Sequence, residues 1–406
     1  MIADLPHLQL DFTEQPPIPE AGIARANELM RSGRLFRYGE TESGELDVAM
    51  LERRFADSVG RRFCVALNSC GASLAVALTA AGVQSGDPVL MNAFTLAPVP
   101  GAVAHVGAEP VFVGITEDYT VDLEDLVAAA ERSGAKFMLV SHMRGHITDM
   151  DELSTVAGGL GVTVIEDCAH TMGAAWGGRP TGTFGTVGCF STQTYKHINS
   201  GEGGLLVTDD EDIAAKAILL SGSYMLYGQH GAAPQAEVFL RHRLTTPNYS
   251  MRMSALAAAV VSPQLDELDK RSQIWNARYA ELAGTLGADP RFVLPVRPAA
   301  EEFVASSIQF RTPDLGPDVV ESWLDLAAEH GVQVKWFGRP EPVGFTSRFD
   351  HWRYASEQSL QKTQEILSTT CDLRIPLGMT SEDADMIARI LLGTLDHSLA
   401  AMGLDS

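Results

Sequence analysis

Between residues 63 and 208 the sequence alternates between short apolar runs and amphipathic stretches, and this alternation restricts the fold more than any other feature. Apolar runs of this length are typical of strands buried on both faces, and the stretches between them are typical of helices that cover a sheet. We expect strands at 63–67, 88–91, 110–113, 137–140, 163–165, 187–190 and 205–208. We expect helices between them at 73–82, 96–106, 123–133 and 151–160. The pattern predicts an α/β fold with a doubly wound, mostly parallel sheet.

The segments before and after this alternation show weaker patterns. Before it, a proline-rich stretch precedes helices expected at 20–32 and 45–58. After it, residues 219–247 are rich in Gly, His and Arg and are expected to form a long loop. A helix expected from about 253 to 279 then leads toward the C-terminus.

Chain length predicts two domains, because 406 residues are too many for one simple core. We expect an N-terminal arm and a large domain at 1–255. A linking helix and a smaller C-terminal α/β domain are expected at 256–406.

The charge balance excludes several classes of partner. Asp and Glu total 52 against 30 Lys and Arg, for a net charge of −22. A chain this acidic, with no basic block, is not expected to bind nucleic acid or a membrane surface. Its five cysteines show no CxxC spacing, and its N-terminus lacks a secretory pattern. We therefore expect a cytoplasmic protein without a metal site.

Three segments carry residues suited to chemistry. Asp167 ends an apolar strand, at the sheet edge where α/β folds bind ligands, although a strand-end aspartate also commonly caps a helix. Lys196 follows another strand and precedes a Ser-Gly-Glu-Gly-Gly turn, and a lysine in a buried polar cleft can form a Schiff base. Most lysines nevertheless lie on the surface.

The third segment, 66–74, turns from a strand through small residues into a helix, which leaves free N–H groups and a positive helix end for a phosphate. Together the segments supply a lysine, a carboxylate and a phosphate cradle in one sheet. These are the groups that a pyridoxal 5′-phosphate (PLP) enzyme needs.

On these motifs the chain resembles the DegT/StrS-type, fold-type I, PLP-dependent aminotransferases that act on keto-sugars and cyclitols. The similarity extends from Ser32-Gly33-Arg34-Leu35 through Ile165–Ala174 and the stretch 190–204 to Ile375-Pro376-Leu377. The resemblance implies a large domain with a mostly parallel seven-stranded sheet and a small C-terminal domain. It also implies a homodimer with active sites at the interface.

The resemblance assigns roles to individual residues. Lys196 would hold PLP as an imine and then move the proton, and Asp167 would pair with the pyridine nitrogen. His170 would face the ring, and the remaining cofactor contacts would be Gly71, Ala72, Ser73, Ser191 and Gln193, with Asn248 and Ser250 supplied by the partner subunit. The candidate substrate-binding residues are Tyr38, Phe94, His197, Tyr224, Arg252 and Arg339.

One departure from the family concerns the residue that stacks on the pyridine ring. The family usually has an aromatic residue at the position occupied here by Leu96, and Phe94 lies two residues earlier. We therefore leave open which side chain covers that face.

The implied reaction moves an amino group from L-glutamate or L-glutamine to a ketone on a sugar or cyclitol, in aminosugar, aminocyclitol or antibiotic biosynthesis. Some relatives are dehydratases with histidine in place of the lysine, and here the histidine, His197, is the next residue. The alternatives are a PLP-dependent dehydratase or other reaction on an amino-acid-derived substrate, and a non-catalytic protein that binds PLP or sugar.

Overall fold

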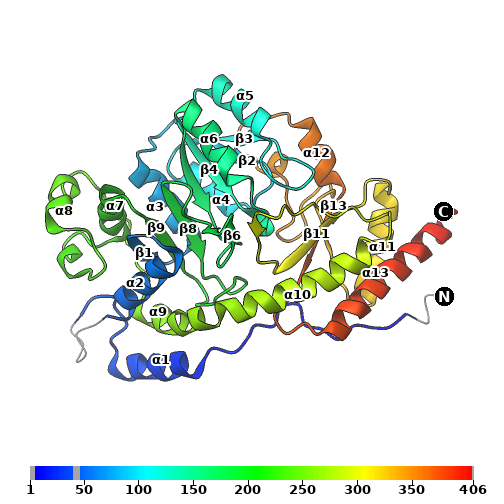
Figure 1. The fold of residues 1–406 in the computed structure, drawn as a ribbon, viewed down its shortest axis with the longest axis horizontal. Helices are drawn as coiled ribbons and strands as arrows, with labels where there is room; N and C mark the ends of the chain where they lie inside the picture. Colours follow the sequence, from blue (N-terminus) through cyan, green and yellow to red (C-terminus); the bar gives the residue numbers. More distant parts are fainter. Residues whose placement is uncertain (1–4, 40–45, 405–406) are drawn as a thin grey trace.

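A computed structural model describes residues 5–39 and 46–404, and its centre is a seven-stranded sheet in the order β1-β9-β8-β5-β4-β2-β3 (Figure 1). The strands are β1 (Phe63–Leu67), β2 (Pro88–Asn92), β3 (Glu109–Val113), β4 (Phe137–Ser141), β5 (Thr163–Asp167), β8 (Val187–Ser191) and β9 (Gly204–Thr208). Only β9 runs antiparallel to its neighbours. Each expected strand lies within one of these seven, so the α/β fold is confirmed.

Helices cover both faces of this sheet, and alternate strand residues point to opposite faces. One face carries α3 (Cys70–Ala81), α4 (Pro98–His105) and α7 (Glu211–Ser221). The other carries α2 (Asp47–Val59), α5 (Leu123–Ser133) and α6 (Met150–Leu160). In β5, for example, Ile165 packs on the face covered by α3, α4 and α7, and Val164 packs on the opposite face.

Two of the expectations for the flanking segments are wrong. Residues 219–247 are not one long loop, because they include the end of α7 and α8 (Ala236–His242), which buries Val238 and Phe239 against it.

The helix expected from 253 to 279 is three elements: α9 (Ala255–Val261), a 3₁₀ segment at Ser262–Glu267, and α10 (Leu268–Leu286). Pro263 explains the interruption, since proline cannot donate the helical hydrogen bond. The helix at Glu20–Ser32 (α1) is confirmed, and the expected start of the next helix, Glu45, lies outside the described residues.

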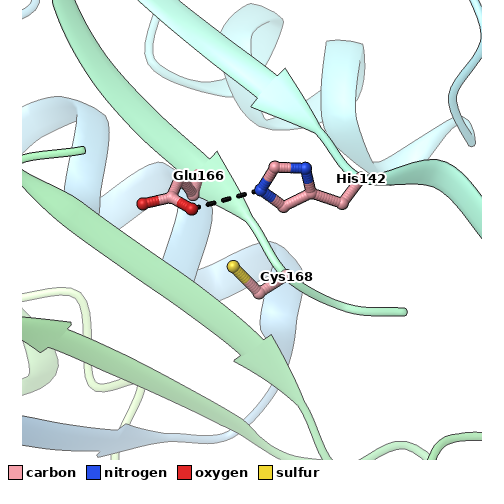
Figure 2. A group of neighbouring side chains, drawn as sticks. All are labelled: His142, Glu166 and Cys168. Carbon is pink, nitrogen blue, oxygen red and sulfur yellow. Dashed lines mark hydrogen bonds and ion pairs between the residues drawn. The ribbon is translucent and has the colours of Figure 1, made fainter. Parts of the chain in front are cut away.

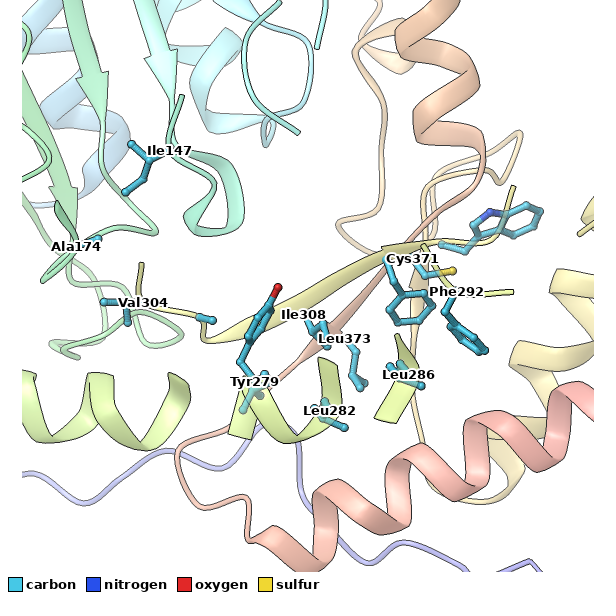
Figure 3. Packing of buried hydrophobic residues seen from close by; sticks show 14 of the residues in the cluster. Ile147, Ala174, Tyr279, Leu282, Leu286, Phe292, Val304, Ile308, Cys371 and Leu373 are labelled. Atoms are coloured by element: carbon cyan, nitrogen blue, oxygen red, sulfur yellow. The ribbon is translucent and has the colours of Figure 1, made fainter. Parts of the chain in front are cut away.

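The C-terminal part contains a small antiparallel sheet, β11-β13-β12, formed by β11 (Ser307–Arg311), β12 (Lys335–Trp336) and β13 (Thr370–Arg374). Helices α11 (Pro317–Glu329), α12 (Gln361–Ser368) and α13 (Ser381–Ala401) complete it. Figure 3 shows Tyr279, Leu282 and Leu286 of α10 below β11 and β13. Ile147 and Ala174 of the large sheet region belong to the same core, so one apolar cluster joins both parts.

A short sheet, formed by β6 (Ala175–Trp176), β7 (Arg179–Pro180) and β10 (Glu301–Glu302), links the two parts as well. The division at residue 255 stays a prediction. Within the ranges that the structure describes, no helix has the length and apolar character needed to cross a membrane.

Candidate active site

The candidate site lies where three parallel strands end. Ser141, Asp167 and Ser191 are the last residues of β4, β5 and β8, so their side chains meet at one edge of the sheet. A cavity of about 410 Å³ opens at this edge. Six of the predicted residues line it: Gly71, Asp167, His170, Ser191, Gln193 and Lys196.

Asp167 is buried but retains free acceptor capacity. Ser141 Oγ donates to its Oδ2 at 2.7 Å, and the Ala169 N–H donates to its Oδ1 at 3.1 Å. Asn92, on the next strand, fixes Ser141 by hydrogen bonds to both its N–H and its carbonyl. Each carboxylate oxygen can accept a second hydrogen bond, so Asp167 can also accept one from a protonated ring nitrogen.

Lys196 reaches the cavity with an electrostatically tuned amine. Its Nζ lies 2.9 Å from His170 Nε2 and donates to it. Burial, followed by the positive charge of Arg144, lowers the pKa of Lys196 to about 8. Burial and then Lys196 hold the pKa of His170 well below its usual range, so this imidazole is neutral and accepts. About a tenth of Lys196 is therefore uncharged at pH 7, far more than for a solvent-exposed lysine, and this fraction can act as a nucleophile.

The first turn of α3 forms the third side of the cavity. Ser69 caps the helix by accepting from the Ala72 N–H at 3.0 Å, and the Ser73 hydroxyl is directed to the Ser69 carbonyl at 3.2 Å. The N–H groups of Cys70 and Gly71 have no acceptor within the helix, as at any helix start. A side chain at Gly204 would collide with the Ser69 backbone, which explains a glycine there in the Ser-Gly-Glu-Gly-Gly turn.

Apolar residues close the cavity from one side. Leu96, Pro98 and Val99 precede or begin α4 and line it, whereas Phe94 is buried against Tyr119 and Phe337 outside the lining. In the part of the chain that the structure describes, His170 has the only aromatic ring among the lining side chains.

His197 does not join Lys196 in the cavity. Its ring packs edge-to-face on Trp275, with centroids 5.2 Å apart, and it is buried. Desolvation, followed by the charge of Lys196, lowers the pKa of His197 to about 3. This imidazole is therefore neutral at physiological pH.

The other predicted substrate residues lie apart from the cavity. Tyr38 bonds His230 and Ser223, Arg252 donates to the Gly222 carbonyl, and Arg339 pairs with Glu321. Tyr224 is exposed.

The two residues expected to reach a partner subunit lie in one exposed turn. Asn248 Oδ1 accepts from the Ser250 N–H at 2.8 Å, and Ser250 adopts the left-handed conformation with φ 53°. Neither lines the cavity of its own chain.

Several lining residues were not singled out from the sequence, among them Ser141. It directly follows the predicted strand 137–140, at the same edge as Asp167, so strand-end position was an available signal. Cys70 lines the cavity from the first turn of α3, within the segment 66–74 predicted to bind a phosphate, although no role was assigned to it individually.

The donor set fits PLP. An anionic carboxylate with spare acceptor capacity suits a protonated pyridine nitrogen, and free helix N–H groups suit a phosphate. Lys196 suits the cofactor aldehyde. The cofactor would therefore be held at three groups: its ring nitrogen by Asp167, its phosphate by the start of α3 and its aldehyde by Lys196.

Comparisons with known proteins agree with this chemistry. Residues 17–392 match the model of the DegT/DnrJ/EryC1/StrS aminotransferase family. The chain is 35% identical to the L-glutamine:2-deoxy-scyllo-inosose aminotransferase of Streptomyces kanamyceticus, over 78% of this chain and 75% of that protein. It is 33% identical to the spore coat polysaccharide biosynthesis protein SpsC of Bacillus subtilis, over 66% of each.

A solved structure supports the same fold. The crystal structure of 3-amino-5-hydroxybenzoic acid synthase matches with a TM-score of 0.81 at 24% identity, covering 97% of this chain and 100% of the other. The chain therefore belongs to the DegT/DnrJ/EryC1/StrS family of PLP-dependent aminotransferases.

Proposed function

We propose that this chain transfers the amino group of L-glutamine or L-glutamate to a ketone on a sugar or cyclitol. The observation that carries the proposal is the placement of Lys196, His170 and Asp167 around one cavity at the sheet edge. The 35% sequence identity to an L-glutamine:2-deoxy-scyllo-inosose aminotransferase supports both the donor and the acceptor class. Amination of such a ketone suits aminocyclitol, aminosugar or antibiotic biosynthesis.

In this reaction the protein residues position groups and move protons. PLP, when bound, withdraws electrons from the carbon that carries the amino group. Asp167 would pair with the cofactor ring nitrogen and so favour its protonated form. Lys196, with its pKa lowered to about 8, is suited to take a proton from the substrate carbon and return one. His170 holds the Lys196 amine at 2.9 Å and in position between these transfers.

The dehydratase alternative is less consistent with the geometry. It needs histidine in place of lysine, yet His197 packs on Trp275 while Lys196 faces the cavity. A non-catalytic role would leave the lowered pKa of Lys196 without a use.

A homodimer belongs to the same proposal. The segment between α7 and α9 exposes Met225 by 72% and Leu244 by 89%, as well as Tyr224 and Tyr249. Several exposed apolar and aromatic side chains in one segment are typical of an interface. Asn248, Ser250 and Arg252 lie in this segment, so pairing would bring them to a second copy's cavity.

The test is the absorption spectrum of the PLP-loaded protein before and after each donor. Bleaching of the visible cofactor band by L-glutamine or L-glutamate, and its return with a keto-cyclitol, is the expected result. Lys196→Ala should show neither change, and Lys216→Ala, whose Nζ bonds the Ala80 carbonyl on another helix, should behave as wild type. A band that no donor bleaches would exclude transamination from these donors.

A further inference from the structure

The turn that follows β4, residues 142–147, packs against the candidate site from outside the cavity. The N–H of His142 donates to the Asp167 carbonyl at 3.1 Å. A Cβ atom added at Gly145 would lie 3.5 Å from the His170 carbonyl oxygen, so the turn also contacts the backbone of that residue. The β4 turn therefore lies directly against two residues that line the cavity.

Two side chains of the β4 turn are held by the small C-terminal sheet. Arg144 Nη2 donates to Asp372 Oδ2 at 2.6 Å, and His146 Nε2 donates to Gln309 Oε1 at 2.8 Å. Gln309 Nε2 in turn donates to Asp372 Oδ1 at 2.7 Å. Both contacts thus end on one buried pair of side chains, from β11 and β13.

The backbone of the β4 turn is fixed to the C-terminal part as well. The Gly145 carbonyl accepts from Arg297 Nη1 at 2.9 Å, and the Ile147 N–H donates to Glu301 Oε1 at 2.9 Å. Gly145 has φ 81°, and a Cβ atom there would come within 2.9 Å of the Val304 carbonyl oxygen. A shift of the C-terminal part would therefore move this turn with it.

Arg144 is the charged residue of the β4 turn, and its orientation is set by its surroundings. It adopts the left-handed conformation, with φ 58°, which costs energy for a residue with a Cβ atom. Its guanidinium lies over the ring of Phe345, 4.9 Å from the centroid, and pairs with Asp372. The Arg144 side chain is 13% exposed and that of Asp372 is 2% exposed, so solvent screens the pair little.

The charge of Arg144 acts on the groups that react. Burial, followed by Arg144, lowers the pKa of Lys196, and Arg144 adds to the effects of burial and Lys196 on the pKa of His170. Because Asp372 carries the opposite charge beside Arg144, it decides how much of the positive charge is felt at Lys196. The other groups that face the amine are Asp167 and Cys70, which raise its pKa, Arg374, which lowers it, and the neutral rings of His170 and His197.

We propose that Asp372 and Arg144 are positioning residues for the reaction. Asp372 holds Arg144 and the β4 turn against the site, and the balance of the two charges sets the electrostatic potential at the Lys196 amine. A buried ion pair stabilises a fold little compared with apolar side chains of the same volume, so stability alone does not account for this one. The proposal rests on the role of Lys196 in the function proposed above.

The pH dependence of the reaction between the apoprotein and PLP tests this proposal, since only the uncharged amine adds to an aldehyde. In wild type the rate should rise with a midpoint near pH 8. Arg144→Gln removes a charge that disfavours the protonated amine, so the midpoint should rise by about 0.5–1 pH unit. Asp372→Asn keeps an acceptor for Arg144 but leaves its charge uncompensated, so the midpoint should fall by about 0.5 pH unit.

The opposite signs distinguish this role from a structural one, because a loosened turn would shift both midpoints in the same direction or neither. Arg144→Lys keeps the charge and should stay within about 0.3 pH unit of wild type. The double variant of Arg144→Gln and Asp372→Asn should lie between the two single variants. Urea unfolding of each variant establishes that it is folded at the pH values compared.

Arg311→Gln is the matched control. Arg311 lies in the same small sheet, is 11% exposed and pairs with its own acid, Glu117, at 2.6 Å. Its substitution should leave the midpoint where it is in wild type. Midpoints of Arg144→Gln and Asp372→Asn that both match wild type, or that shift in the same direction, would overturn the proposal.

Acetylation by acetic anhydride separates this inference from the proposed function. Mass spectrometry of the Lys196 peptide, after labelling the apoprotein across a pH series, gives the midpoint of the amine without the cofactor. Lys216, which bonds the Ala80 carbonyl, is the internal reference and should not shift. If the Lys196 midpoints shift as stated but PLP forms no bond with Lys196, only the proposed function fails. If wild type transfers the amino group and the midpoints do not shift, only this inference fails.

Discussion

Glu166 and Asp167 are adjacent carboxylates at the end of β5, yet they lie in opposite environments. Glu166 Oε1 accepts from the Gly185 N–H at 2.6 Å, and Oε2 accepts from the Gly182 N–H at 2.8 Å and lies 3.1 Å from His142 Nε2. Asp167 points to the other face, lines the cavity and has two partners. The carboxylate with three buried partners supports the fold, whereas the one that faces the cavity with two partners is available for chemistry.

Figure 2 shows the Glu166 side, with His142 and Cys168 beside the carboxylate. Their ligand atoms lie within 4.8 Å of one another, a grouping that could suit a metal ion. Burial alone would raise the pKa of Glu166, but the bonds from His142, Gly185 and Gly182 lower it overall. Burial also keeps the Cys168 thiol protonated, with its pKa well raised. A cation would have to displace these donors, so we interpret the group as structural.

The strongest test of the comparison is Asp167→Asn. Without the negative charge the cofactor ring nitrogen loses its proton, and turnover should fall about 10²- to 10⁴-fold. The free energy of unfolding of the apoprotein should change by less than about 1 kcal/mol, because the amide keeps the Ser141 contact. Turnover within a few-fold of wild type would contradict the assignment.

Glu166→Gln should give the converse result. The amide turns an N–H group toward donors that need an acceptor, so unfolding free energy should fall by about 3 kcal/mol in urea titrations. At a temperature where the variant is folded, it should still bind PLP and transfer the amino group. A variant as stable as wild type would show that Glu166 is not the structural member of the pair.

Lys196→Met should stabilise the apoprotein. Because the folded-state pKa is about 8 and the ordinary value is 10.5, burial penalises the charged lysine in the folded state. The gain should be about 1–3 kcal/mol below pH 8, shrink between pH 8 and 10.5, and vanish above that. Thermal unfolding across this pH range measures it. A gain that is the same at every pH would mean that the pKa is not lowered.

Ser141→Ala should have the smallest effect. It removes one donor to Asp167, worth about 1–2 kcal/mol, so the Kd for PLP should rise about 5- to 30-fold. Ser154→Ala, which removes a hydroxyl bonded to the Met150 carbonyl on α6, is the control and should leave the Kd unchanged. An unchanged Kd in Ser141→Ala would remove Ser141 from the site.

The strands could be predicted because buried strands of a parallel sheet leave continuous apolar runs. The lysine, the aspartate and the first turn of α3 could be predicted as strand-end motifs. Pro263 itself signals the break between α9 and α10, but the apolar periodicity around it favoured one long helix. The placement of Phe94, Tyr38 and Arg339 could not be predicted, since their partners lie far away in sequence.

Arg374 shows the same limit more clearly. The sequence places an arginine before Ile375-Pro376, but only the folded chain brings it beside Tyr195 and Lys196. Such long-range packing is a property of the tertiary structure.

The most direct test of the proposed active site is to identify which lysine holds PLP. The chain has six lysines: Lys136, Lys196, Lys216, Lys270, Lys335 and Lys362. Borohydride reduction of the PLP-loaded protein makes the bond permanent, and peptide mass spectrometry then locates it. We expect the cofactor mass on the peptide that contains Lys196 and on no other. Labelling of another lysine, or of none, would contradict it.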